Sequence, residues 1–171
     1  FPEYLMCKKL NIEAIPTGSL SLDVALGLDI SGKSRMLNLS ELPHVLIAGQ
    51  TGAGKSSCIN SIVSSLLIKT HPDDVKMIMV DPKRVELTPF NGIPHLIAPV
   101  IVDVDQVNPM LRALMSEMLS RYKLMEEVGA RNIFAYNSKS KEPMPYLVLI
   151  VDELADLMMV GGFEIEQNLV R

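Results

Sequence analysis

Apolar and polar residues alternate along the chain in blocks that predict short buried strands separated by amphipathic helices. Short apolar runs lie at 44–49, 75–80 and 146–151; the first ends in Gly49, the second is followed by Asp81-Pro82 and the third by Asp152. Runs of this length, bounded by turn-forming residues, are typical of buried strands. The run at 96–102 contains Pro99, which removes a ladder hydrogen bond, so it predicts at best a short or edge strand.

Helical spacing appears in two long segments. Between Gly54 and Lys69 the apolar residues recur every three or four positions, which predicts a helix. A longer helix is predicted to start at Pro109 with Asn108 as its N-cap, because proline is tolerated in the first turn of a helix. Gly129 suits the C-terminal cap of this helix. The helix carries one apolar stripe that we expect to face the core, made of Leu111, Leu114, Met115, Met118, Leu119, Tyr122 and Met125.

The C-terminal part of the chain continues the alternation. Residues 137–145 are polar and contain proline, which predicts a loop before the apolar run at 146–151. A helical turn is expected at 154–160, where Gly161-Gly162 should end it, and a last helix is expected from about Phe163. Strands that alternate with helices predict an α/β fold with a largely parallel sheet, although these patterns leave the strand order open.

Composition and charge narrow the class of protein. The 171 residues are 48% hydrophobic, enough for one domain with a real core, and no stretch approaches the length of a membrane span. Cys7 and Cys58 fit no disulfide or metal framework, which favours a reducing, cytoplasmic compartment. The histidines, at 44, 71 and 95, show no metal-ligand spacing. A net charge of −4 gives no support for nucleic-acid binding.

A phosphate-binding loop is the most specific motif in the sequence. The stretch GQTGAGKS at 49–56 has the spacing of Gly, four residues, Gly, Lys and Ser, and it lies between a predicted strand and a predicted helix. Its amides and the helix N-terminus suit the phosphates of ATP, Lys55 is expected to reach the β and γ phosphates, and Ser56 to bind Mg²⁺. The expected nucleotide contacts are Gly49, Gln50, Thr51, Gly52, Ala53, Gly54, Lys55, Ser56 and Ser57.

Two acidic residues follow the most hydrophobic run. Asp152 is expected to hold Mg²⁺ through water, because a strand that ends in an acid presents it at the carboxyl edge of a parallel sheet. Glu153 is expected to orient or deprotonate the attacking water, so Glu153 and Lys55 are the predicted catalytic residues. The alternative is that Asp152 caps the next helix and Glu153 is a solvated surface acid.

A second polar group follows the run at 75–80. Asp81, Lys83 and Arg84 lie where ligands gather in α/β sheets, so a nucleotide-sensing or subunit-contacting role is one interpretation. The other interpretation is that Lys83 and Arg84 are simply solvated cations at the end of a strand.

The residues around these motifs resemble the motor domain of FtsK/SpoIIIE DNA translocases from about residue 25 to the end. The resemblance divides the chain into residues 1–24, of uncertain assignment, and residues 25–171, a partial RecA-like ATPase motor domain. The matching stretches are ALGLDISG (25–32), LPHVLIAGQTGAGKSSCINS (42–61), VDPKRVELTPFNGIPHLIAPV (80–100), EMLSRYKLM (117–125), ARNIFAYN (130–137) and PYLVLIVDELADLMM (145–159).

The resemblance implies a function and partners that composition does not show. It implies a truncated RecA-like P-loop NTPase fold, a homo-hexameric ring with ATP and Mg²⁺ between subunits, and ATP-driven movement along double-stranded DNA in chromosome segregation at cell division. It also implies a cytoplasmic motor in a full-length protein anchored in the cell membrane. The family's sensor and arginine finger are expected beyond residue 171, so we expect the isolated piece to hydrolyse ATP weakly.

Alternative functions come from other resemblances. The stretch TGSLSLDVALG at 17–27 is similar to the segment before the P-loop in RecA-type recombinases. Related ATPases that move protein in secretion, or DNA in conjugation, share the P-loop context, although the DPKRVEL and GIPHL stretches favour the chromosomal type. A nucleotide-binding piece with no activity of its own is the remaining alternative.

Overall fold

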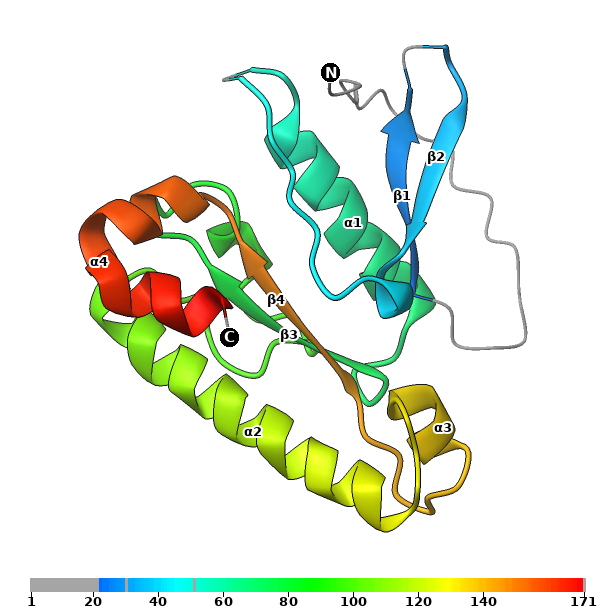
Figure 1. Cartoon of the computed structure of the whole chain (residues 1–171). Helices are drawn as coiled ribbons and strands as arrows, with labels where there is room; N and C mark the ends of the chain where they lie inside the picture. Colours follow the sequence, from blue (N-terminus) through cyan, green and yellow to red (C-terminus); the bar gives the residue numbers. More distant parts are fainter. Residues whose placement is uncertain (1–21, 30, 51, 171) are drawn as a thin grey trace. The chain divides into compact units, whose positions relative to one another are not determined.

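The computed structural model describes residues 22–29, 31–50 and 52–170 of the chain. These residues belong to two compact units, of which the first ends at His71 and the second begins at Pro72. Figure 1 shows the elements of both units, and each unit is considered separately below. The expected α/β class is confirmed, because a parallel strand pair is combined with helices.

The first unit contains a strand hairpin and one helix. Strand β1 (Asp23–Leu28) pairs antiparallel with β2 (Ser34–Asn38), and a short 3₁₀ turn (Leu39–Glu41) follows. The Asp29 carboxylate closes the hairpin turn: it accepts hydrogen bonds from the Ser31 hydroxyl at 2.6 Å and from Arg35 Nε at 2.8 Å. These hydrogen bonds lower the pKa of Asp29 to about 2, and the bond from the Ser31 hydroxyl has the largest effect on it.

The strand expected at 44–49 is wrong. Residues 43–50 form no strand, and the side chains of Val45 and Leu46 are 43% and 80% exposed. A strand needs a neighbouring backbone that supplies hydrogen bonds, and no described strand pairs with this segment. The helix expected next is confirmed as α1 (Lys55–Lys69), which begins one residue after Gly54.

The second unit contains the parallel pair. Strand β3 (Val75–Val80) pairs with β4 (Tyr146–Val151) in a continuous register, so that Val80 lies opposite Val151. Both strands were expected at these bounds. The segment around Pro99 makes two isolated parallel bridges to β3, at Leu96 and Ile101. It lies along the edge of β3 without forming a continuous strand, which agrees with the expectation of at best a short or edge strand.

Two helices pack together beside this pair (Figure 1). Helix α2 (Val107–Glu127) and helix α4 (Leu154–Val170) share a buried cluster with the end of β3. The shared cluster consists of Val80, Val107, Leu111, Leu157 and Ile165. The cluster joins β3 to helices that are far from it in sequence. Its packing holds the carboxyl end of the parallel pair in place.

The start of α2 differs from the expectation. The helix begins at Val107 with Gln106 as its N-cap, directly after a 3₁₀ turn (Val104–Gln106), so Asn108 is not the cap. Pro109 lies at the third helical position. An N–H group there would have no acceptor within the helix, so the lack of one in proline costs no hydrogen bond. The expected C-terminal cap is confirmed: Gly129 has φ +59°, and the Ala130 N–H donates to the Met125 carbonyl at 2.8 Å.

The apolar stripe of α2 is only partly buried, so the expectation that it faces the core along its whole length is wrong. Leu111 and Met125 are buried, whereas Leu119 and Tyr122 are each 56% exposed. A helix of 21 residues is about 31 Å long, and a strand of six residues spans only about 20 Å. The strands are therefore too short to cover the whole helix.

The helix break expected at Gly161-Gly162 is also wrong, because α4 runs continuously through both positions. Glycine costs about 1 kcal/mol in a helix, and tertiary packing overrides such costs. Here Leu157 and Ile165, eight residues apart and both fully buried, supply that packing.

A short helix α3 (Ile133–Asn137) completes the second unit before the predicted polar loop. Its N-cap is Asn132, whose side chain accepts a hydrogen bond from the Ala135 N–H at 2.8 Å. Another 3₁₀ turn (Thr88–Phe90) lies in the segment after β3. Within the described part of the chain, no helix is both long and apolar enough to cross a membrane.

Candidate functional site

The candidate phosphate-binding loop leads directly into helix α1. Gly54 is the N-cap of α1 with φ +94°, and Gly52 has φ +81°, a conformation that residues with a Cβ rarely adopt. The loop closes through a hydrogen bond from the Ala53 N–H to the Gln50 carbonyl at 2.9 Å. The backbone path therefore requires glycine at positions 52 and 54.

The N-terminus of α1 suits an anion. Gly54 supplies no side-chain cap, and the first turn of α1 contains no acidic residue. The first amides of a helix have no intrahelical acceptor and carry a positive partial charge. Lys55 and Ser56, both half-buried, are the first two residues of this turn. A phosphate would therefore meet amide donors and a cation here.

Helix α1 is held in place by polar side chains at four-residue spacing. The Ser61 hydroxyl donates to the Ala25 carbonyl at 2.7 Å, and Lys69 Nζ donates to the Asp23 carbonyl at 2.9 Å. Between them, the Ala25 N–H donates to the Ser65 hydroxyl at 3.3 Å. Residues four apart share one face of a helix, so this face is bonded to the backbone of β1. Cys58 is buried on the same helix as a packing residue.

Of the predicted nucleotide contacts, the structure places Gly49, Gln50 and residues 52–57 in this one loop and helix turn. Thr51 lies outside the described residues. A Cβ at Gly49 would approach the Ala53 Cβ to 3.2 Å, so a larger residue there would push against the loop. The assignment of these residues to the nucleotide stays a prediction.

The two predicted acids follow β4 in the second unit. Asp152 is 7% exposed, and its backbone N–H donates to the Val80 carbonyl at 3.1 Å, one step beyond the β3–β4 ladder. Glu153 is half-buried and directly precedes α4. The structure therefore brings both acids to the carboxyl edge of the parallel pair, where the sequence predicted them. Their metal-binding and catalytic roles stay predictions.

Lys83 reaches this acidic edge from the end of β3. Its Nζ lies 2.9 Å from the Asp156 carboxylate and 4.0 Å from the Glu153 carboxylate. The hydrogen bond and the charge of Asp156 raise the pKa of Lys83, and the charges of Glu153 and Asp152 add to this effect. The sequence interpretation left the role of Lys83 open and did not single out Asp156, because their contact joins two segments that are about 70 residues apart.

Asp81 anchors the loop that carries Lys83. Its side chain is fully buried, and its Oδ2 accepts hydrogen bonds from the N–H groups of Leu87 at 2.9 Å and Thr88 at 3.2 Å. Burial raises the pKa of Asp81, but the backbone donors, Leu87 first, outweigh this effect and lower the pKa below its ordinary value. Asp81 is thus an ionised structural residue, a role that its position between a strand and a proline did not reveal.

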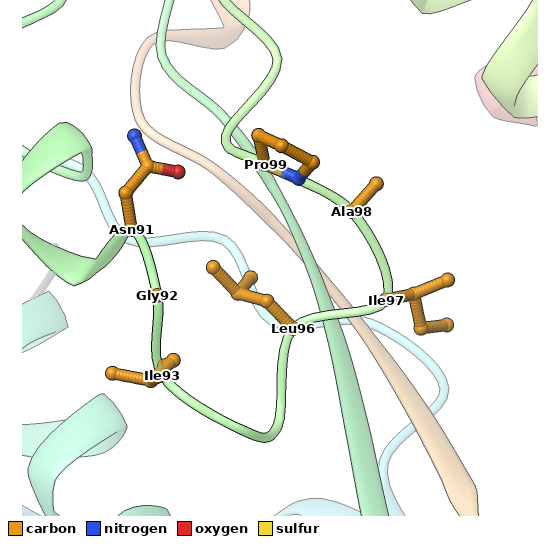
Figure 2. A pocket seen from close by; sticks show the side chains of 7 residues that line it. All are labelled: Asn91, Gly92, Ile93, Leu96, Ile97, Ala98 and Pro99. Carbon is orange, nitrogen blue, oxygen red and sulfur yellow. The ribbon is translucent and has the colours of Figure 1, made fainter.

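Other candidates add no site. His95 is buried, whereas His44 and His71 are exposed, and no cluster of three metal-ligating side chains occurs among the described residues. Figure 2 shows a hollow formed by residues 91–99, which is lined mainly by apolar side chains. The Asn91 carboxamide accepts a hydrogen bond from the Val100 N–H at 2.8 Å, so it stabilises the loop rather than offering chemistry.

Relatives of known name match most of the chain. The chain is 49% identical over 158 residues to a protein named DNA translocase FtsK from Sporosarcina ureae, and 47% identical over 160 residues to one of the same name from Listeria monocytogenes. These alignments cover 86% and 88% of this chain but 20% and 21% of the relatives. The chain thus spans about a fifth of the length of these relatives.

Solved structures of ATPases are similar in fold. The conjugation coupling protein TcpA of pCW3, with ATPγS, has a TM-score of 0.70 and 32% identity over 99% of this chain and 46% of its own. The type VII secretion ATPase EccC of Thermomonospora curvata has a TM-score of 0.74 and 26% identity, over 88% of this chain and 19% of its own. The fold is therefore that of a P-loop ATPase motor domain.

A family model covers nearly the whole sequence. The model of the FtsK/SpoIIIE family matches residues 9–171, which include the phosphate-binding loop, the Lys83 loop and both acids. The chain therefore belongs to the FtsK/SpoIIIE family.

Proposed function

We propose that the protein containing this chain is an ATP-driven translocase that moves along double-stranded DNA; relatives that match it carry the name DNA translocase. The observation that carries ATP binding is the start of α1, where the left-handed Gly54 exposes uncapped helix amides next to Lys55. DNA as the substrate is supported by the name of the relatives, whereas the net charge of −4 does not favour it. The choice of double-stranded DNA rests on the family resemblance.

The side-chain types proposed for the site are ones that bind a magnesium nucleotide. Mg²⁺ is usually held by one or two protein oxygens together with phosphates and waters, so a large cluster of acids is not needed. The Ser56 hydroxyl and Asp152, through water, are the proposed ligands, and the loop at 49–57 is the proposed phosphate cradle. Bound Mg²⁺ would neutralise the phosphate charge that develops during hydrolysis.

The proposed chemistry assigns two further roles. Lys55 binds the β and γ phosphates, where its positive charge stabilises the transferring group. Glu153 accepts a proton from, or orients, the water that attacks the γ phosphate. The proposal also includes a homo-hexameric ring with nucleotide between subunits. It further includes a role in chromosome segregation and a membrane anchor elsewhere in the protein. Within such a protein this chain is cytoplasmic, and taken alone it is weakly active.

The proposal is tested by the ATPase rate of the full-length protein with no DNA, with double-stranded DNA and with single-stranded DNA of equal length. We expect strong stimulation by the duplex only. Equal rates in all three conditions would contradict DNA translocation and would favour a motor that moves protein, which the fold similarity to EccC makes the second candidate. Stimulation by single strands alone would favour a recombinase.

A further inference from the structure

The loop after β3 and the start of α4 meet at one edge of the parallel pair. Val80 lies opposite Val151, so the chain leaves both strands at the same level of the sheet. Three residues beyond Val80, Lys83 contacts Asp156 in the first turn of α4 at 2.9 Å. Its Nζ also lies 4.0 Å from Glu153, which immediately precedes this turn. Lys83 is therefore near the predicted catalytic acid itself and also near a carboxylate in the helix turn that follows it.

The position of Lys83 is fixed from behind. The fully buried Asp81 receives the N–H groups of Leu87 and Thr88, which closes the loop on itself. Asp81 also donates its own N–H to the Ile101 carbonyl at 2.8 Å, so the base of the loop is bonded to the neighbouring strand edge. The loop that carries Lys83 is thus hydrogen-bonded at both ends. The Lys83 side chain extends from this loop to the two acids.

On the other side, α4 is fixed by its core. Leu157, one residue after Asp156, is fully buried against Val80 and the residues of α2. Glu153 lies between Val151, which also packs against this cluster, and the start of α4. The Asp152 N–H already donates to the Val80 carbonyl, and the contact of Lys83 with Asp156 adds a side-chain link between the loop after β3 and the helix turn that follows Glu153.

We propose that Lys83 is a positioning residue for ATP hydrolysis, which fixes Glu153 toward its water by holding Asp156 and the first turn of α4. The inference rests on the proposed function, because it takes Glu153 as the catalytic acid. Lys83 contacts neither water nor nucleotide in this role. Its effect is on turnover, since small displacements of a reacting group lower the rate of the chemical step by large factors.

The test is steady-state ATPase kinetics of the full-length protein with saturating duplex DNA. Lys83→Met keeps the length of the side chain and removes its charge, and it is expected to lower kcat about tenfold with KM for ATP changed less than about twofold. Lys83→Arg keeps the charge and should restore most of kcat. Asp156→Asn should lower kcat to the same extent as Lys83→Met.

The double variant and a control isolate the contact. Because both substitutions remove one interaction, the double variant should be no slower than either single variant. Lys123→Met is the matched control: Lys123 is an exposed lysine of α2 in the same unit, and the same change there should leave kcat unchanged. Thermal melting of each variant checks folding, which an ion pair with a 55% exposed lysine should hardly affect.

Several results would overturn the inference. These are a normal kcat for Lys83→Met, a raised KM with normal kcat, or effects of the two single substitutions that multiply in the double variant. A Glu153→Gln variant separates this inference from the proposed function. If that variant hydrolyses ATP normally, the assignment of Glu153 fails; if it is inactive while Lys83→Met is normal, only the role of Lys83 fails.

Discussion

At the scale of single residues, the proposed chemistry depends on a few side chains whose places in the fold are described. Lys55 begins α1, and the buried Asp152 and half-buried Glu153 end the parallel pair. Neither Lys55 nor Glu153 belongs to the buried core, so each can be changed with little effect on folding. Binding and hydrolysis can therefore be separated by substitution.

Lys55→Ala should weaken ATP binding by about 100-fold or more, because it removes hydrogen bonds between a cation and two phosphates. Isothermal titration calorimetry measures the affinity, and thermal melting should show an unchanged midpoint. Lys33→Ala, at an exposed lysine of the same unit, removes an equal charge and should leave the affinity as it is. An unaltered affinity in Lys55→Ala would exclude the proposed phosphate contact.

Glu153→Gln should bind ATP normally but hydrolyse it about 10²- to 10⁴-fold more slowly in the full-length protein, since an amide cannot accept the proton from water. Phosphate release under saturating ATP measures this rate. Glu142→Gln, on an exposed loop of the same unit, serves as the control with a matched change. Full turnover in Glu153→Gln would require another base.

At the scale of elements, two loops depend on how their backbone amides are placed and bonded. The loop before α1 requires a left-handed residue at Gly54, and the loop after β3 requires the buried carboxylate of Asp81. Both loops lie at the end of a regular element, where backbone amides have no partner within that element. Substitutions there act through those amides.

Gly54→Ala should destabilise the protein by about 1–2 kcal/mol, because an alanine at φ +94° is strained, and it should also weaken ATP binding as the amides turn away. Urea unfolding and calorimetry measure the two effects. Gly32→Ala places the same strain, at φ +79°, in the hairpin turn and should cost similar stability while ATP affinity is retained. Equal losses of affinity in both variants would argue against a specific role for the loop.

Asp81→Asn should lower the free energy of unfolding at pH 7 by about 1–3 kcal/mol, because a charged acceptor of buried backbone donors is lost. The folded pKa of Asp81 is lowered, so its stabilisation is complete above the unfolded pKa of about 3.8 and is lost as the pH falls through the folded pKa. The difference between variant and original should therefore shrink in acid.

Urea unfolding at a series of pH values measures this difference. Asp105→Asn, an exposed aspartate of the same unit, should show no comparable effect at pH 7. A constant difference between Asp81→Asn and the original protein down to pH 2 would show that the carboxylate charge is not what stabilises the loop.

At the scale of the whole molecule, the predicted nucleotide loop and the predicted acids belong to different compact units of the chain. The relatives are about five times as long as this chain, and the proposal places ATP between subunits of a ring. Hydrolysis would then be a property of the assembly, with each subunit depending on its neighbour.

This dependence predicts that inactive subunits poison active ones. When full-length Lys55→Ala protein is mixed with unaltered protein at a constant total concentration, the ATPase rate should fall more steeply than the fraction of active subunits. A strictly proportional fall would contradict cooperation in a ring. Mixing with an unrelated protein at the same concentration controls for crowding.

The sequence by itself determined the fold class, helix α1, strands β3 and β4, and the positions of the candidate loop and acids. These features are local: the spacing of Gly54, Lys55 and Ser56 and the apolar run before Asp152 lie within a few residues, where backbone geometry and side-chain type act directly.

Only the tertiary structure decided the features that depend on distant partners. The segment at 44–49 is apolar but pairs with no strand in the described part of the chain, and the middle of the α2 stripe is apolar but exposed. Helix α4 runs through a glycine pair because buried residues on both sides hold it. The contact between Lys83 and Asp156 joins segments that meet only because β3 and β4 are parallel. Burial and ion pairing depend on what lies across the fold, and local sequence does not contain that information.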